Sequence, residues 1–202
     1  MARKSKEDME LTRLALLEAA LHLFAEKGYS KTTLNDIAQR AGYTRGAVYW
    51  HFDGKVSIFN EVMNHYGTPL KKLLVREISA SEMPTEWFRS LYRSYVKILL
   101  ENEELQTAMF VRVRKTEFPE ELISFYNQQR VEQAELLEAM KEQFALGIEQ
   151  GLFRKGIKPD VGASSAMAFL IGLFGLLFTQ SKPVCIDHMY EIIEVFMKSL
   201  EE

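Results

Sequence analysis

Cysteine is almost missing from this sequence, since Cys185 is the single one among 202 residues. One thiol excludes a disulfide framework, cannot hold a metal ion by itself, and fits a reducing compartment. We expect no signal sequence before the first amphipathic stretch, and hence a cytoplasmic protein.

Catalytic motifs are missing as well. The sequence has no glycine-rich phosphate loop and no nucleophile motif. Its four histidines lie far apart and have no partners at metal-ligand spacing on a helix: His22, His51, His65 and His188. We therefore expect no catalytic residues, no metal, no cofactor and no enzyme. A helical scaffold that binds other proteins stays open as an alternative to a DNA-binding regulator, and a DNA gel shift would separate the two.

The sequence also lacks a strong excess of charge, with a formal net charge of −3. Residues 1–55 hold nine Lys/Arg against seven Asp/Glu, whereas the remainder holds sixteen against twenty-one. Arg3, Lys4 and Lys6 form a short basic arm that can reach phosphates or a minor groove of DNA. A frayed tail is the alternative.

No part of the sequence indicates strands, because no window alternates with period two over more than a few residues. Apolar residues recur instead at helical spacing, first in residues 14–24, before Gly28. A fourth helix begins near Gly54, and Pro69 should kink or break it. We expect the remaining helices over 70–78, 85–101, 103–116, 119–150, 159–180 and 185–200. The fold class is all-α.

Residues 33–55 carry the most informative pattern, two short helices joined by a glycine turn. Thr33 can N-cap the first helix, with Asp36 three positions later as in a capping box. Gly42 stands where the chain reverses, in the left-handed conformation that glycine takes without strain. Thr44 then caps a helix of barely two turns, too short to exist for stability alone. A DNA major groove accepts a helix of this width.

The exposed side of this short helix fits contact with DNA. Val48 is its apolar anchor, whereas Arg45, Gly46 and Tyr49 fall on the outward side. Arg45 can bind the O6 and N7 atoms of a guanine, the commonest specific base contact. Gly46 removes a side chain where the backbone must approach the duplex.

Phosphate contacts are expected at the end of this segment. Tyr49 and His51 carry donors at the height of the phosphates. Lys55, just after the cap Asp53, lies where free N–H groups of the next helix can bind an anion. A solvated lysine and a tyrosine packed on the next helix are the alternatives. The predicted DNA-binding residues are Thr33, Tyr43, Thr44, Arg45, Gly46, Tyr49, His51 and Lys55.

A multi-point pattern covers the first 60 residues: 16–24, Gly28, Tyr29, Thr32, Thr33, Ile37, Ala38, Ala41, Gly42, Gly46, Tyr49, His51, Phe52, Lys55 and Phe59. It resembles the TetR family of transcriptional regulators. The start Met-Ala-Arg-Lys, the string Thr-Arg-Gly-Ala-Val-Tyr-Trp-His-Phe and residues 114–118 resemble its AcrR-type branch, which represses multidrug efflux pumps. Tyr43 departs from the small aliphatic residue usual in the family, and Gly67 departs from an acidic pocket residue.

The resemblance implies a helix-turn-helix DNA-binding domain over 1–55 and a ligand-binding and dimerisation domain over 56–202. It also implies a pocket walled by the fourth to eighth helices. The aromatic and methionine side chains of the middle of the chain would build an apolar cavity, or simply core. The implied pocket residues are Met63, Tyr66, Leu70, Met109, Phe110, Val113, Gln129, Gln133 and Phe169.

Residues 161–181 contain no charge, which raises the alternatives of a membrane span, a dimer interface or intrachain core. The fully apolar part, 166–178, has the length of a buried helix. Small residues form one stripe on it, namely Ala168, Gly172, Gly175 and Thr179. Larger ones form another, namely Met167, Ile171, Phe174 and Phe178. The final helix is apolar at Met189, Ile192, Ile193, Phe196, Met197 and Leu200. We expect two such helices from each subunit to close a four-helix bundle in a homodimer, with no membrane contact.

The resemblance therefore implies a TetR-type repressor of a multidrug efflux or related operon. It would bind a near-palindromic double-stranded DNA operator as a homodimer. A hydrophobic or amphipathic small molecule in the body would displace the fourth helix and release the operator.

Overall fold

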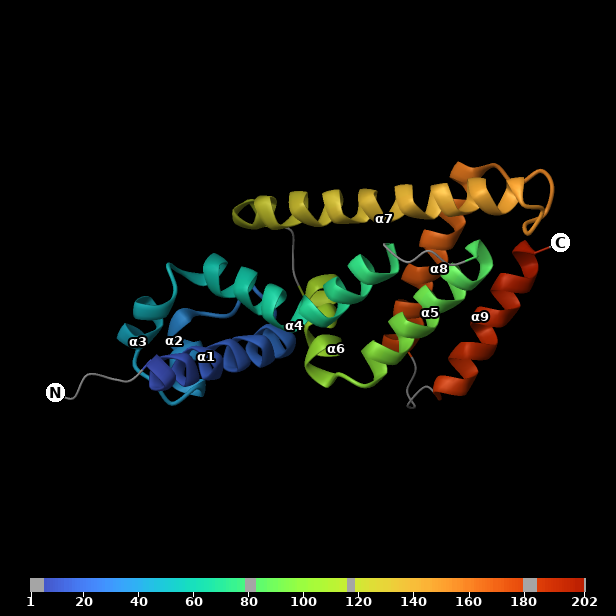
Figure 1. The fold of residues 1–202 in the computed structure, drawn as a ribbon. Coiled ribbons are helices and arrows are strands. Elements are labelled where there is room, and N and C mark those ends of the chain that lie inside the picture. Colours follow the sequence, from blue (N-terminus) through green and yellow to red (C-terminus); the bar gives the residue numbers. More distant parts are fainter. Residues whose placement is uncertain (1–5, 79–82, 116–118, 180–184, 202) are drawn as a thin grey trace. The chain divides into compact units, whose positions relative to one another are not determined.

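The computed structural model describes residues 6–78, 83–115, 119–179 and 185–201. Helices are the regular elements of these ranges, as predicted, with one isolated bridge between Phe153 and Glu201 (Figure 1). The helices are α1 (Lys6–Lys27), α2 (Leu34–Arg40), α3 (Arg45–His51), α4 (Lys55–Ile78), α5 (Pro84–Leu100), α6 (Glu103–Phe110), η1 (Val111–Lys115), η2 (Glu120–Leu122), α7 (Ile123–Glu149), α8 (Pro159–Thr179) and α9 (Ile186–Leu200).

Helix α4 does not break at Pro69. The predicted break at this proline is therefore wrong. It runs without interruption from Lys55 to Ile78 with Pro69 inside. Proline removes a single backbone donor, and the turn that follows is held by the buried side chains of Leu70 and Leu73. Burial of an apolar face stabilises a helix more than one backbone hydrogen bond does.

The two predicted helices around Pro119 differ in detail from the structure. Helix α6 ends at Phe110 and is followed by a π-helical turn, η1, and α7 is preceded by the 3-10 turn η2. Residues 1–5, with Arg3 and Lys4 of the basic arm, and residues 116–118 lie outside the described residues.

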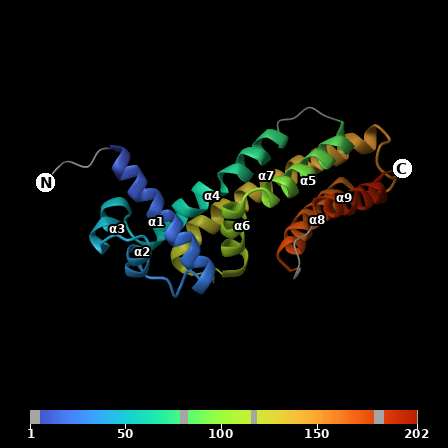
Figure 2. The same cartoon turned by 90° about the horizontal axis from the view of Figure 1, so that it is seen from below.

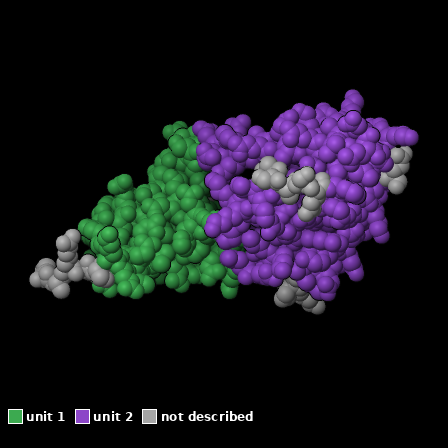
Figure 3. Space-filling view, viewed as in Figure 1, with its two compact units in different colours: residues 1–68, 103–126 green, residues 69–102, 127–202 purple. Residues whose placement is uncertain are grey.

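The chain forms two compact units, which Figure 3 colours separately. Unit 1 comprises residues 1–68 and 103–126, and unit 2 comprises residues 69–102 and 127–202. The division between these compact units lies inside α4, because Ile58, Phe59 and Val62 of α4 belong to the same core as α1. The division into functional domains at residue 55 stays a prediction.

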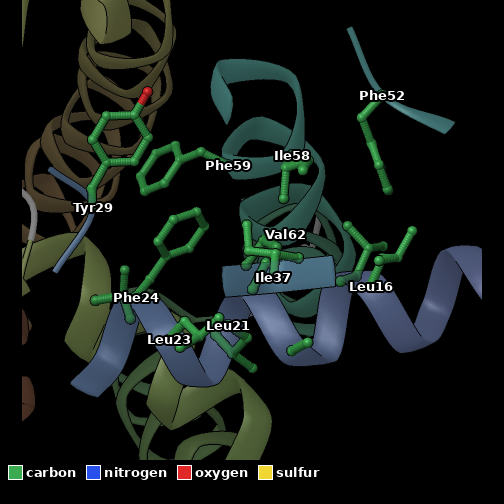
Figure 4. Close-up of a cluster of buried hydrophobic side chains, with 14 of the residues drawn as sticks. Leu16, Leu21, Leu23, Phe24, Tyr29, Ile37, Phe52, Ile58, Phe59 and Val62 are labelled. Atoms are coloured by element: carbon green, nitrogen blue, oxygen red, sulfur yellow. The ribbon is translucent and has the colours of Figure 1, made fainter. Parts of the chain in front are cut away.

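The core of unit 1 fixes the two short helices of residues 33–51. Ile37 of α2 is fully buried against α1 and α4 (Figure 4). Val48 of α3 is fully buried in the same core. Burying such a side chain contributes about 1.5–3 kcal/mol. The rings of Phe24, Tyr29 and Phe59 pack against one another in this core, with centroids 5.2 to 5.7 Å apart. Helices α2 and α3 therefore keep their places although each has only seven residues.

In unit 2, α5 packs against α8 and α9, and the last two helices also touch each other (Figures 1 and 2). The Tyr92 hydroxyl of α5 donates to the Ala166 carbonyl of α8 at 3.2 Å. The rings of Phe169 and Phe196 stack with centroids 3.9 Å apart. Arg89, three positions before Tyr92 on α5, forms ion pairs with Glu194 and Glu201, which fixes the end of α9.

Candidate functional site

Helix α2 begins with the predicted capping box. The Thr33 hydroxyl accepts from the Asp36 backbone N–H at 3.1 Å, and the Asp36 carboxylate accepts from the Thr33 N–H at 2.9 Å. Lys27 donates to the same carboxylate at 2.7 Å. The lysine bond first, and the two bonds with Thr33 next, lower the pKa of Asp36 to about 2. Asp36 therefore stays ionised and pins the start of α2 to the end of α1.

The turn between α2 and α3 also follows the prediction. Gly42 has φ of +75°, in the left-handed region that favours glycine. The Tyr43 N–H then donates to the Ala38 carbonyl at 2.9 Å, and the half-buried Tyr43 ring packs against the core of unit 1. Thr44 caps α3 by accepting from the Ala47 N–H at 3.3 Å. These bonds set the angle at which α3 leaves the turn.

Helix α3 buries Val48 and presents a polar and aromatic face to solvent. Arg45 donates to the Tyr49 hydroxyl at 2.9 Å, and the Tyr49 side chain is 51% exposed. A Cβ atom at Gly46 would meet only the Thr44 hydroxyl, at an ordinary 3.7 Å. The fold itself does not require glycine there, which favours an outside partner that approaches the backbone.

Trp50 is the residue of this face that the sequence analysis missed. Its side chain is 66% exposed, and its ring meets the His51 ring with centroids 4.8 Å apart. Trp50 follows Gly46 by four positions and therefore shares its side of the helix. Helical spacing alone could have found it.

A hollow of about 640 Å³ lies beside α3 in unit 1. Its lining consists of Met9, Thr12, Thr44, Gly46, Ala47, Trp50 and His51. Three of these residues, Thr44, Gly46 and His51, belong to the predicted DNA-binding set. Their side of α3 is therefore open in the free protein.

Lys55 has partners inside the protein. Its ammonium donates to the carbonyls of Tyr29 at 3.2 Å and Ser30 at 3.4 Å, and it lies 4.2 Å from the centroid of the Tyr29 ring. The Tyr29 hydroxyl donates to Glu121 at 2.7 Å; burial first, and this bond next, raise the pKa of Tyr29. Lys55 thus joins α4 to the turn after α1, and its contact with phosphate stays a prediction.

The nine predicted pocket residues divide between the two units. In unit 1, Met63 and Met109 are buried, Tyr66 and Phe110 are half-buried, and Val113 is exposed on η1. In unit 2, Leu70 is buried, Gln129 and Phe169 are half-buried, and Gln133 is exposed. Burial raises the pKa of the Tyr66 phenol, with smaller contributions from the negative charges of Glu18 and Glu104. Tyr66 is therefore a neutral phenol.

An acidic residue that the sequence analysis missed lies beside Gln129. The Gln129 amide donates to Glu132 at 3.3 Å, and Lys71 donates to the same carboxylate at 2.7 Å. The family resemblance led us to expect an acidic pocket residue at position 67, where this sequence has glycine. Glu132 follows Gln129 by three positions on α7, so the helical spacing indicates their contact.

Helix α8 exposes much of its apolar surface. The segment Pro159–Phe178 is long and apolar enough to cross a membrane, with a mean hydropathy of 2.0, and 39% of its most apolar window is buried in the structure. A Cβ atom at Gly172 or Gly175 would meet nothing within 4 Å. Thus these two glycines of the stripe do not touch intrachain core, while the side chain of Thr179 lies outside the described residues.

The structure differs from the expected dimer interface in two ways. Ile171 is 56% exposed and does not share the buried face of Met167 and Phe174. On α9, four of the six apolar residues are buried inside the chain, namely Met189, Ile193, Met197 and Leu200. In the structure α9 packs against α5, so these buried side chains are not available to a second subunit.

Comparison with known proteins finds relatives for the helix-turn-helix and for the fold. The profile described as bacterial regulatory proteins, tetR family, matches residues 16–62. The probable acrEF/envCD operon repressor of Escherichia coli strain K12 is 34% identical over 127 residues, which make up 61% of this chain. The match spans a little over half, 57%, of that curated relative.

Solved structures match over nearly the whole chain. NalD, the secondary repressor of the MexAB-OprM multidrug efflux pump in Pseudomonas aeruginosa, is 32% identical with a TM-score of 0.81, covering 98% of this chain and 99% of NalD. SmeT, the repressor of the Stenotrophomonas maltophilia pump SmeDEF, is 25% identical with a TM-score of 0.73, covering 96% and 93%. With its helix-turn-helix in residues 16–62 and its similarity to NalD, this chain belongs to the TetR family of bacterial regulatory proteins.

Proposed function

We propose that this protein is a ligand-responsive repressor that binds a near-palindromic DNA operator as a homodimer. The observation that carries the proposal is the exposed face of α3, where Arg45, Tyr49 and Trp50 surround a glycine that the fold does not require. The family is one of regulatory proteins and not of enzymes. Because operator DNA lies inside the bacterial cell, the site of action is the cytoplasm.

The controlled gene is a multidrug efflux or related operon. NalD and SmeT are described as repressors of multidrug efflux pumps, and the E. coli relative as a probable repressor of the acrEF/envCD operon. The similarity to NalD extends over both compact units, which supports a related signal as well as a related DNA-binding unit.

The second subunit covers the exposed face of α8. Ala168, Gly172 and Ile171 form an uncharged surface there, and Val195 of α9 adds an apolar side chain that is 72% exposed. Small residues let two helices approach closely, and two helices from each protomer make a four-helix bundle. We propose a second copy and not a membrane, because the opposite face of α8 is packed against α5 through Tyr92 and Ala166.

The effector is a hydrophobic, partly planar molecule held mainly by apolar burial. Five of the nine predicted residues around it are aromatic or methionine side chains, namely Met63, Tyr66, Met109, Phe110 and Phe169. Gln129 with its neighbour Glu132 supplies polar groups that orient the molecule. An effector weakens operator binding only as far as its affinities for the DNA-bound and released states differ.

The operator proposal is tested by selecting bound fragments from the organism's genomic DNA and then measuring affinity against salt. We expect one family of near-palindromic sites, bound far more tightly than random duplex. Equal affinity for all duplexes at every salt concentration would contradict a sequence-specific repressor.

The dimer proposal is tested with Gly172, whose surroundings are open in the protomer. Gly172→Leu should force the two copies of α8 apart and give monomers or aggregates in analytical ultracentrifugation. Gly172→Ala, which adds one methyl group, is the control. A Gly172→Leu protein with an unchanged dimer would place the interface elsewhere, and wild-type protein in a membrane fraction would favour the membrane alternative.

A further inference from the structure

A groove in unit 2 lies between the second half of α4 and α5. Its volume is about 530 Å³, within the range of small-molecule sites. Helix α4 contributes four residues, and α5 with its C-cap contributes four more, at positions i, i+3, i+4 and i+7, which form one continuous face on each. The lining residues are Pro69, Lys72, Leu73 and Arg76 of α4, Ser94, Lys97 and Ile98 of α5, and Glu101, the C-cap of α5.

The groove combines an apolar strip with positive charge. Pro69, Leu73 and Ile98 supply the apolar surface. Lys72, Arg76 and Lys97 supply three cations, whereas Glu101 is the one anion of the lining. A ligand that matches this pattern carries an apolar body and a negative charge.

Arg76 is held in place by a buried carboxylate. Its guanidinium pairs with Glu77, whose side chain is only 3% exposed, through a 3.0 Å bond from Nε. The Ser90 hydroxyl donates to the other oxygen of Glu77 at 3.0 Å, and Arg76 also reaches the Ser94 hydroxyl at 3.5 Å. The Arg76 side chain nevertheless remains 68% exposed, so its position is fixed while it stays open to a ligand.

The other two cations, Lys97 and Lys72, are held less firmly than Arg76. The Lys97 ammonium lies 4.0 Å from Glu101, and both side chains are well exposed. An exposed pair at this distance contributes little. For Lys72 the described residues contain no ion-pair partner. Positive charge therefore exceeds negative charge in the groove even when Glu77 is counted.

We propose that this groove binds a single-chain amphiphilic anion from solution, such as a medium-chain carboxylate. The chain lies on Pro69, Leu73 and Ile98, and the carboxylate lies between Lys72 and Lys97, with Arg76 beside it. A concave groove encloses one chain, whereas a membrane surface calls for a convex apolar face. None of the nine predicted effector residues lines this groove, so the site is additional to the proposed effector pocket.

The test uses tryptophan fluorescence. The chain has two tryptophans, and the indole N–H of buried Trp87 donates to the Glu77 carbonyl at 2.6 Å, next to the groove. In a Trp50→Phe background the emission therefore comes from Trp87. Decanoate, titrated below its critical micelle concentration, should change this emission saturably. Its affinity should fall as salt is added, and the neutral analogue 1-decanol should bind roughly tenfold more weakly.

Variants separate the groove from other sites. Lys72→Gln with Lys97→Gln should weaken decanoate roughly tenfold or more, since both cations that flank the carboxylate are lost. Arg76 is kept, because its removal would leave the buried Glu77 carboxylate unpaired. The matched control is Lys155→Gln with Lys158→Gln, two exposed lysines of the segment between α7 and α8. It removes the same charge and should leave binding unchanged.

Several outcomes would overturn the proposal. Equal binding of decanoate and 1-decanol would show that the cations take no part. Unchanged binding in the Lys72→Gln and Lys97→Gln protein, with its thermal unfolding like that of the control, would place the ligand elsewhere. The absence of a saturable response to decanoate would exclude the site. Operator binding is not read in this test, so its outcome is independent of the proposed repressor function.

Discussion

Arg45 and Tyr49 lie one helical turn apart on α3 and are already hydrogen-bonded at 2.9 Å in the free protein. The guanidinium also lies 5.4 Å from the centroid of the tyrosine ring. Two side chains that share a bond lose less conformational freedom when they meet DNA than two independent ones. At the scale of single residues, the exposed face of α3 is thus partly organised before binding.

Arg45→Ala should weaken operator binding by about 1–3 kcal/mol and relax the preference at one base pair in each half-site. The reason is that the guanidinium can reach both acceptors of a guanine. Fluorescence anisotropy with the selected operator and with single-base variants would measure both effects. Lys55→Ala is the comparison, because its loss should weaken all duplexes similarly; equal, sequence-independent losses in both variants would sink the role of Arg45 as base reader.

Asp36 should give the protein a pH-dependent stability at low pH. Its folded pKa of about 2 lies below its ordinary value of 3.8, so the carboxylate stabilises the fold above pH 3.8. This contribution is lost as the pH falls through 3.8 toward 2, where Asp36 takes up its proton. Urea unfolding of wild type and Asp36→Asn at several pH values would measure it. The difference between the two should shrink as the pH is lowered, and a constant difference would contradict the assigned bonds to Lys27 and Thr33.

Helix α8 shows how one element can use glycine in two ways. A Cβ atom at Gly162 would lie 2.6 Å from the Phe144 ring, closer than side chains tolerate, whereas one at Gly172 would meet nothing. Because Gly162 has no side chain, α7 can approach α8 closely at this point of unit 2. Gly172 leaves a flat, open surface that the protomer itself does not use.

Gly162→Ala should destabilise the protein by about 1–3 kcal/mol, because the added methyl group overpacks the Phe144 ring. Gly172→Ala should be neutral or stabilising for the protomer by up to about 1 kcal/mol, since alanine favours the helix. Thermal unfolding at matched protein concentrations would compare them. Equal stability of the two variants would mean that Phe144 moves aside at no cost.

Helix α4 runs from one unit into the other, as α7 also does. Pro69 opens the part of α4 that belongs to unit 2, and the preceding part ends at Thr68. Pro69 removes one backbone donor at the point where the units divide. The helix that the proposed mechanism displaces therefore has one backbone donor fewer at this point.

On the scale of the whole molecule, the proposed effector releases the operator only if effector binding and DNA binding are coupled in the same protein. A panel of aromatic and amphipathic compounds should contain a ligand that raises the melting temperature in a concentration-dependent way. The same ligand should lower operator affinity by roughly 5–150-fold, the usual range of such coupling.

Phe110→Gln should abolish this release while operator binding in the absence of effector stays near normal. Phe110 is half-buried, so a polar side chain of similar reach is better tolerated there than in place of the buried Met109. Thermal shift and anisotropy measured on the same samples would test both halves of the expectation. If no compound of the panel stabilises the protein or releases DNA, the drug-sensing hypothesis fails, and a repressor with another signal remains.

The sequence by itself determined the local elements and the helix-turn-helix, because their causes lie within a few residues. The capping box of Thr33 and Asp36, the left-handed Gly42 and the cap Thr44 are readable from residue type and spacing, and each is present in the structure. The all-α class follows in the same way from apolar periodicity.

Only the tertiary structure decided which neighbours each side chain meets. It gave the Lys55 ammonium two carbonyls from the turn after α1, kept α4 continuous through Pro69, and turned Met189 and Ile193 of α9 inward. Periodicity shows that a face is apolar, but not whether its partner is the same chain or a second copy. Long-range packing is the physical reason, since it is set by residues far apart in the sequence.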